Sequence, residues 1–387
     1  MKKKIAVFTA TRAEYGLLYW LLKDINEDKD LILQLLVSGT HLSPEFGETY
    51  KQIEIDGFNI NEKVEILLSS DSPVGVAKSM GLGLLGFSEA LNRLDPDLLI
   101  ILGDRFEALA AAQTAMILRI PILHIHGGEI TEGAYDDAIR HAITKLSSLH
   151  ATSTKEYRNR VIQLGESPDR VFNVGALGLD YLTHGEFLSV IELSDSLNFS
   201  ITKPYFVLTY HPVTLADESQ EKTLNNILAA LDNFQETQVI ITYPNSDDGG
   251  RRLITIIEDY AANRKDKALV VPSLGQKRYL SALKHSVAVI GNSSSGIIEA
   301  PSLCVPSINI GSRQKGRISA KSVVHCDTDY HSIFKEITNA LNIKKSGVNL
   351  KFDNPYFNGG ASKKILNIIK NESFEVIKSF FDIRVIQ

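Results

Sequence analysis

The chain has 387 residues, 44% of them apolar and 22% charged, and a formal net charge of −5 at pH 7. This length favours two domains, and the mild negative charge argues against a nucleic-acid-binding face. No apolar run reaches the ~20 residues that a membrane span requires, no stretch fits a signal peptide, and the two cysteines lack metal-ligand spacing, so we expect a reduced cytoplasmic protein.

Short apolar runs alternate with helical patterns through the first part of the chain. The predicted strands cover residues 5–8, 32–37, 98–102, 122–125, 150–152 and 171–174. The predicted helices cover residues 17–25, 74–94, 106–118, 137–146 and 154–164. Continuous apolar strands are typical of a sheet covered on both faces, so this part predicts a doubly wound parallel sheet.

The alternation restarts after residues 175–203, where polar residues interrupt it. Strands are predicted at 205–209, 239–242, 268–271, 287–290, 307–310 and 323–325, and helices at 221–234, 251–264, 277–285 and 297–303. The sequence therefore predicts an α/β fold with two Rossmann-like, doubly wound domains facing a central cleft. We place them at residues 1–175 and 176–362, followed by a helical tail, 363–387, that packs back on the first domain.

Polar residues follow several predicted strands of the first domain. Because ligands of open α/β sheets bind outside the carboxyl ends of the strands, these residues are candidates for a site. Arg12 follows the first strand, where it could meet a phosphate or form a surface pair; its loop is not GxGxxG, which argues against a dinucleotide cofactor. Asp104 precedes Arg105 and could be a helix N-cap or part of an acidic rim.

A histidine-rich string, His124-Ile-His-Gly-Gly-Glu129, follows the fourth predicted strand. Strand alternation would point His124 and His126 the same way, but no third metal ligand has suitable spacing, so we predict no metal. The glycine pair allows a turn that brings Glu129 into the cleft. Asp136 and Asp137 open the next helix, one as its cap and the other free for chemistry. Crowded carboxylates raise one another's pKa, as an acid/base pair requires.

The most informative string of the second domain is Gly291-Asn-Ser-Ser-Ser-Gly-Ile-Ile-Glu299, which follows an apolar run. A turn of small residues before a helix start offers backbone N–H groups to a phosphate, and Glu299 could accept hydrogen bonds from a ribose diol. His211 precedes a proline in an extended conformation and could titrate near neutrality or donate to a phosphate. Asn245 and Arg313 follow other strands as candidate nucleotide contacts.

Together these strings resemble the hydrolysing UDP-N-acetylglucosamine 2-epimerases of the bacterial sialic-acid type. The resemblance extends from residue 4 to beyond residue 325 and rests on Thr9-Ala-Thr-Arg-Ala-Glu-Tyr-Gly16, Gly103-Asp-Arg105, His124-Ile-His-Gly-Gly-Glu129, Asp136-Asp-Ala-Ile-Arg-His-Ala-Ile-Thr-Lys145, His211-Pro-Val-Thr214, Gly291-Asn-Ser-Ser-Ser-Gly296 and Gly311-Ser-Arg-Gln314.

The resemblance implies a GT-B-like fold, a homodimer, and cleavage of UDP-GlcNAc to UDP and N-acetylmannosamine with no cofactor. UDP would leave by anti elimination to give a 2-acetamidoglucal, which water then attacks at C1. A 2,4-diacetamido-trideoxy sugar of the legionaminic acid route, or a GT-B glycosyltransferase activity, are the alternatives.

The family's functional residues transfer to matching positions of this sequence. Its essential carboxylates correspond to Asp104 and Asp136, and its cleft histidine to His211. The chain departs from many relatives at His126, where they have a glutamate, so either His126 or Glu129 handles the proton. The implied nucleotide-binding set is Arg12, Arg105, His211, Asn245, Ser293, Ser294, Gly296, Glu299 and Arg313.

Overall fold

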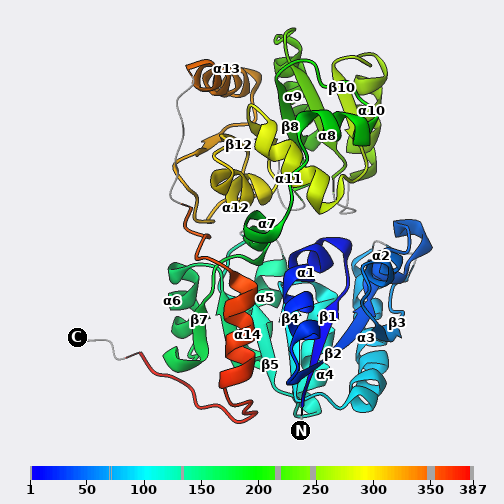
Figure 1. The fold of residues 1–387 in the computed structure, drawn as a ribbon, viewed down its shortest axis with the longest axis vertical. Helices are drawn as coiled ribbons and strands as arrows, with labels where there is room; N and C mark the ends of the chain where they lie inside the picture. The colour runs from blue at the N-terminus through cyan, green and yellow to red at the C-terminus, as the bar shows by residue number, and fades with distance from the viewer. Residues whose placement is uncertain are drawn as a thin grey trace. The chain divides into compact units, whose positions relative to one another are not determined.

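The computed structural model describes residues 2–68, 70, 72–131, 135–213, 219–244, 250–346 and 354–383. The chain forms two compact units, each with its own parallel sheet (Figure 1). The first unit comprises residues 1–130, 135–180 and 356–387, and the second comprises residues 131–134 and 181–355. The predicted α/β class with two Rossmann-like domains is thereby confirmed.

The sheet of the first unit has seven strands in the order β3-β2-β1-β4-β5-β6-β7. The strands are β1 (Lys3–Thr9), β2 (Leu31–Ser38), β3 (Ile60–Val64), β4 (Leu98–Leu102), β5 (Ile122–Ile125), β6 (Leu149–Thr152) and β7 (Val171–Asn173). The apolar runs of β1, β4 and β5 are fully or almost fully buried, as expected for strands covered on both faces.

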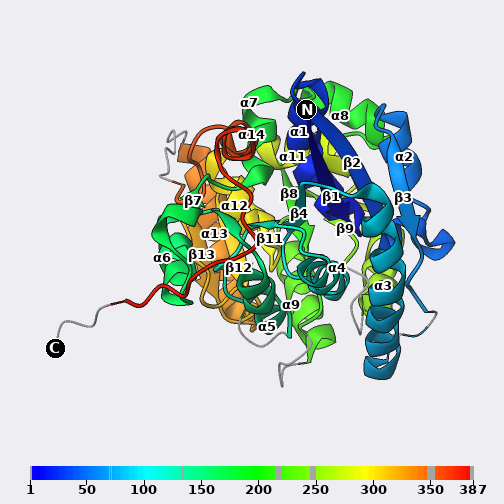
Figure 2. The same ribbon diagram turned by 90° about the horizontal axis from the view of Figure 1, so that it is seen from below.

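Helices cover both faces of this sheet. They are α1 (Arg12–Glu27), α2 (Tyr50–Ile55), α3 (Pro73–Leu94), α4 (Phe106–Ile117), α5 (Tyr135–Leu146), α6 (Lys155–Gln163) and α14 (Ala361–Asn371), with short 3-10 turns at Gly39–Leu42, Pro44–Phe46, Pro168–Arg170 and Leu177–Leu179. Side chains of α1 and α14 share one core with the sheet, and those of α3 and α4 share a second. Figure 2 shows α3 and α4 side by side.

The sheet of the second unit has six strands in the order β10-β9-β8-β11-β12-β13. The strands are β8 (Tyr205–Thr209), β9 (Gln238–Thr242), β10 (Ala268–Val271), β11 (Val289–Gly291), β12 (Ser307–Ile310) and β13 (Val323–Cys326). The helices are α7 (Asp180–His184, which begins on the last residue of the first unit), α8 (Val190–Leu197), α9 (Gln220–Asp232), α10 (Gly250–Ala262), α11 (Gly275–His285), α12 (Ser295–Ser302) and α13 (Tyr330–Ser346).

The end of the chain belongs to the first unit. The Asp180 carboxylate accepts hydrogen bonds from the backbone N–H groups of Ala361 and Ser362, and so caps α14. The helix ends at Asn371, so the helical prediction for the tail is wrong for residues 372–383. The segment after it is instead held by Lys378, which binds the buried Glu166 at 2.8 Å. Within the described ranges, no helix is long and apolar enough to cross a membrane.

Candidate functional site

In the first unit, β1, β4, β5 and β6 are neighbours in the sheet. The residues that follow these parallel strands therefore gather at one edge. Asp104 lies there in the turn between β4 and α4. Helix α4 begins at Phe106 with Arg105 in the N-cap position, so the alternative that Asp104 is an N-cap is wrong. Its carboxylate forms an ion pair with Arg140, whose side chain on α5 is 4% exposed.

His124 of β5 bonds to the same turn. Its Nε2 lies 2.8 Å from the Gly103 carbonyl and its Nδ1 lies 3.1 Å from the Thr144 hydroxyl. Burial lowers the pKa of His124 to about 3, so the ring is neutral. Because a carbonyl only accepts, Nε2 carries the proton and the Thr144 hydroxyl donates to Nδ1. His124 is therefore a structural link between β4 and α5.

His126 lies outside the strand, because β5 ends at Ile125. Its φ of +65° is in the left-handed region, so the strand alternation expected for His124 and His126 is wrong at this position. The His126 Nδ1 atom lies 3.3 Å from a Glu129 carboxylate oxygen. The Ser153 hydroxyl donates to the same oxygen at 2.8 Å.

The acidic start of α5 differs from the predicted arrangement. Asp136 and Asp137 both lie inside the helix, which spans Tyr135–Leu146, so neither occupies the N-cap position. Asp137 lies 3.5 Å from the Nε2 atom of His141 and 4.0 Å from Arg140, while Asp136 is half-buried. Among the described residues, no group of three His, Cys, Asp or Glu side chains could hold a metal ion.

The two arginines predicted to contact the nucleotide differ in their surroundings. Arg12 is exposed on the first turn of α1. Arg105 donates from Nε to the fully buried Glu107 carboxylate at 3.2 Å. Glu14 caps α1 by accepting from the Ala10 and Thr11 N–H groups, and burial raises its pKa to about 7. This part of the edge is therefore an ionic cluster internal to the first unit.

In the second unit, β8 and β12 flank β11, so the turn after β11 lies beside the ends of both. Gly291 has a φ of +126°, and a Cβ here would collide with the Thr209 carbonyl, so only glycine fits. The fully buried Asn292 side chain then bonds both backbone groups of His211: Oδ1 accepts from its N–H at 2.7 Å and Nδ2 donates to its carbonyl at 2.9 Å.

Two side chains after β12 bind the Asn292 carbonyl. Arg313 donates to it at 3.1 Å and Gln314 at 2.8 Å. Burial, followed by the charge of Arg313, lowers the pKa of His211 to about 3. The ring is neutral at pH 7, which contradicts titration near neutrality and leaves hydrogen bonding as its role.

The hydroxyl-rich turn precedes α12. The Ser293 and Ser295 hydroxyls are 3.1 Å apart, and the Tyr279 hydroxyl of α11 bonds to Ser295. The lack of a side chain at Gly296 allows α12 to pack closely on β12, because a Cβ there would collide with the Ser307 hydroxyl. The remaining predicted residues of this turn, Ser294 and Glu299, are half-buried, and Asn245 lies outside the described residues.

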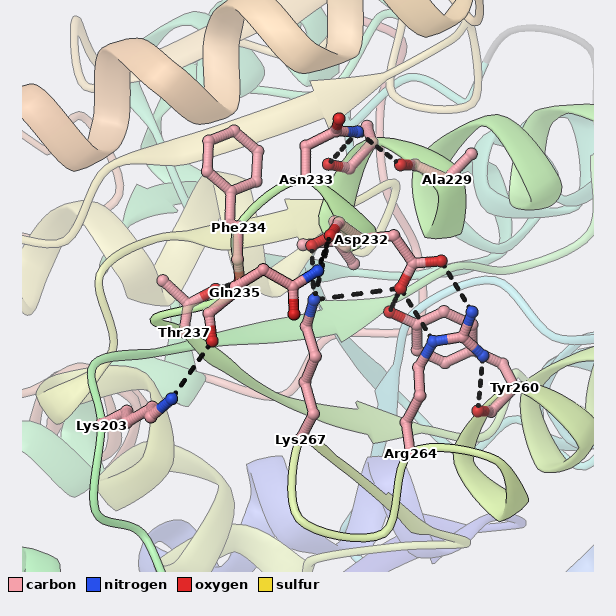
Figure 3. Close-up of polar contacts among 12 residues, drawn as sticks. Lys203, Ala229, Asp232, Asn233, Phe234, Gln235, Thr237, Tyr260, Arg264 and Lys267 are labelled. Carbon is pink, nitrogen blue, oxygen red and sulfur yellow. Dashed lines mark hydrogen bonds and ion pairs between the residues drawn. The ribbon is translucent and has the colours of Figure 1, made fainter.

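A separate ionic cluster lies at the opposite, amino edge of this sheet. Asp232 ends α9, and its carboxylate accepts from Arg264 Nη2 at 2.7 Å and from the Tyr260 hydroxyl at 3.0 Å (Figure 3). Lys267, directly before β10, donates to the Leu231 carbonyl at 3.0 Å. These contacts join the α9 end to the α10–β10 loop, so we assign them to stability.

The structure also brings in residues that the sequence did not single out. Arg140 contacts Asp104 and Ser153 contacts Glu129. Asn292 contacts His211, and Tyr279 contacts Ser295. Arg140 and Asn292 lie inside motif strings, so their position was a usable signal. Ser153 and Tyr279 lie outside all of these motifs, so no signal in the sequence pointed to them.

Comparison with known proteins gives a consistent result. The family described as UDP-N-acetylglucosamine 2-epimerase matches residues 23–370. A Campylobacter jejuni protein named GDP/UDP-N,N'-diacetylbacillosamine 2-epimerase (hydrolyzing) is 42% identical over 87% of this chain and 88% of its own. The Escherichia coli polysialic acid biosynthesis protein P7 is 38% identical over 98% of both chains. The structure of a Neisseria meningitidis UDP-GlcNAc 2-epimerase bound to UDP-GlcNAc covers 96% of this chain and 100% of its own, with a TM-score of 0.79 at 17% identity.

Proposed function

This chain belongs to the UDP-N-acetylglucosamine 2-epimerase family, in its hydrolysing, sialic-acid type, and we propose that it cleaves a UDP-activated 2-acetamido sugar to UDP and the free, 2-epimerised sugar. The observation that carries this proposal is that Asp104 and the His126–Glu129 pair follow the neighbouring strands β4 and β5 at the carboxyl edge of the first sheet. A proton-transfer reaction needs such positioned groups.

We assign diphosphate binding to the second unit. The turn that contains Ser293 and Ser294 offers hydroxyls and a helix N-terminus, and Arg313 adds a charge that does not titrate. A neutral His211 can donate a hydrogen bond. Such preorganised donors stabilise the charge that develops on a departing diphosphate. Glu299 would accept from the ribose, and Arg12 and Arg105 are proposed to add nucleotide contacts.

We assign the chemistry on the hexose to the first unit. A base removes the proton from C2 while the C1–O bond breaks and UDP leaves, giving the 2-acetamidoglucal. Water then adds at C1, and a proton reaches C2 from the opposite face. Asp104 and Asp136 are proposed as catalytic carboxylates. General acid–base help of this kind contributes roughly 10²–10⁴ in rate.

Two substrates are supported by different relatives. The first candidate is UDP-N,N'-diacetylbacillosamine, because the Campylobacter jejuni protein, at 42% identity, is named for that sugar. The second is UDP-GlcNAc, the substrate expected from the sequence, because the Neisseria meningitidis protein of the same fold binds it. With either substrate, we propose a role in the synthesis of sialic or another nonulosonic acid.

The test is incubation of the purified protein alone with each nucleotide sugar, followed by product analysis. We expect free UDP and the 2-epimerised sugar, with higher kcat/KM for the true substrate; a GDP-linked sugar tests the choice of nucleotide. Substrate that stays intact until an acceptor is added would indicate a glycosyltransferase. An epimerised sugar still attached to UDP would indicate a non-hydrolysing epimerase, and binding without turnover a sensor. Light scattering tests the expected homodimer.

A further inference from the structure

The turn from His126 to Glu129 is fixed at both ends. The His126 N–H donates to the Ala151 carbonyl at 2.9 Å, and Arg160 of α6 donates to the Gly128 carbonyl. Gly128 has a φ of +80°, and a Cβ there would collide with the Tyr157 carbonyl. A histidine in the left-handed region is uncommon, and such outliers cluster at functional sites.

The two left-handed residues fold the turn so that Glu129 returns to His126. Its carboxylate lies 3.3 Å from Nδ1, and it also accepts from Ser153 on the chain that follows β6. The imidazole is 11% exposed, whereas the Glu129 side chain is only 4% exposed. Both side chains are therefore almost fully buried, and the His126 Nε2 atom lies in the buried part of the ring.

We propose that His126 is the proton acceptor of the reaction and that Glu129, held by Ser153, is its positioning residue. This resolves which group takes the role that many relatives give to a glutamate, and it rests on the proposed function. Glu129 accepts a hydrogen bond from Nδ1–H, which fixes the tautomer in which Nε2 is the basic nitrogen.

The proposed step is balanced without a co-reactant. Nε2 takes the proton from C2, the electrons of the C2–H bond form the C1=C2 double bond, and the C1–O electrons leave with UDP. The ring becomes an imidazolium cation, and the neighbouring Glu129 anion balances its charge. The same logic explains why a buried carboxylate supports a catalytic histidine elsewhere.

Other titratable groups around the turn come from three elements. His124 of β5 is neutral, because burial lowers its pKa to about 3. The pKa of His141 on α5 is also lowered by burial, and Arg160 of α6 is a permanent cation. Glu129 is the carboxyl group that contacts the His126 ring directly.

The key experiment is the pH dependence of kcat/KM in Glu129→Gln. Loss of the anion disfavours the imidazolium, so His126 stays basic to lower pH. We expect the acidic limb to move down by about one pH unit, and kcat to fall roughly 10–100-fold with little change in KM. Glu129→Asp should restore part of both. Ser153→Ala should move the acidic limb of the kcat/KM profile in the same direction by a smaller amount. This variant provides the test if Glu129→Gln does not fold. His126→Gln should remove the limb and lower kcat by about 10²–10⁴.

UDP affinity, measured by calorimetry on every variant, controls for folding. If His126→Gln keeps the acidic limb while Glu129→Gln removes it, Glu129 is the base and the inference is overturned. If Asp104→Asn is inactive but the variants at 126, 129 and 153 behave like wild type, the inference fails and the proposed function stands. If the wild-type protein releases no UDP from any nucleotide sugar, the proposed function itself fails.

Discussion

The carboxyl edges of the two sheets have different chemistry. At the first, charged groups meet in pairs: Asp104 with Arg140, and Arg105 with Glu107. At the second, hydroxyls, amides and an uncharged His211 lie beside Arg313. Opposed charges can set protonation states, whereas neutral hydrogen-bond donors beside a cation suit a diphosphate that must bind and leave. This difference supports our proposal that the first unit carries the catalytic groups and the second unit binds the diphosphate.

The largest expected effect is on turnover in the first unit. Asp104→Asn should lower kcat by about 10²–10⁴, because it removes a carboxylate held by Arg140, and the Kd for UDP should change less than about twofold. UDP release and calorimetry measure the two. The control is Asp95→Asn, whose carboxylate is 85% exposed. Turnover of Asp104→Asn near that of the control would break the comparison.

The next effect is on affinity in the second unit. Arg313→Ala should weaken UDP binding about tenfold or more, since hydrogen bonds from charged groups contribute roughly 1.5–3 kcal/mol. Gln314→Ala is the matched variant, because Gln314 donates to the same Asn292 carbonyl without a charge. A smaller loss of UDP affinity in Gln314→Ala than in Arg313→Ala would show that Arg313 acts through its charge and not only by supporting the turn. Unchanged affinity in Arg313→Ala would remove it from the site.

A smaller effect should come from Tyr279→Phe, which removes the hydroxyl bonded to Ser295. Losing one neutral hydrogen bond is typically worth about 0.5–1.5 kcal/mol, so we expect UDP affinity to fall roughly 2–10-fold with kcat unchanged. Tyr205→Phe is the control, because that buried hydroxyl bonds the Ala282 carbonyl instead. Equal losses of affinity in both variants would mean a general effect on the unit.

The smallest effect on activity is expected at the amino edge of the second sheet. Asp232→Asn should leave turnover and UDP affinity unchanged but lower the free energy of unfolding by about 1 kcal/mol, because it weakens the bonds to Arg264 and Tyr260. Urea denaturation measures this, with the exposed Asp259→Asn as control. A loss of activity at Asp232 would show that the ionic groups of this unit are not purely structural.

Most of the fold could be predicted because its central strands are continuous apolar runs. The edge strand β3 was missed, since its sequence, Ile-Asn-Glu-Lys-Val, alternates and is mostly solvent-facing. Helix α13 was also missed, and its buried residues Ile333, Ile337 and Ala340 occupy one narrow stripe. The helical prediction for the tail failed after Asn371, where Lys378 and Glu166 hold an irregular segment through contacts distant in sequence.

The candidate site was also predictable only in part, because many of its contacts join residues that are distant in sequence. Positions after strands pointed to Asp104 and His126 in the first unit and to the serine turn in the second, because each parallel sheet gathers the residues after its strands at one edge. Their partners could not be deduced: Arg140 lies 36 residues from Asp104, and Asn292 lies 81 residues from His211. Such pairings depend on how helices pack, which periodicity does not encode. The strand ends at Ile125, as predicted, but the alternation was extended one residue too far, to the left-handed His126.

The capping of α14 by Asp180 has a consequence for synthesis on the ribosome. Helix α14 supplies Ile365 and Ile369 to the core it shares with α1, yet it is translated after all of residues 181–355. The nascent first unit must therefore wait with an incomplete apolar face while the second unit emerges. Domains generally fold in the order of translation, but here the unit that starts first is the one that finishes last.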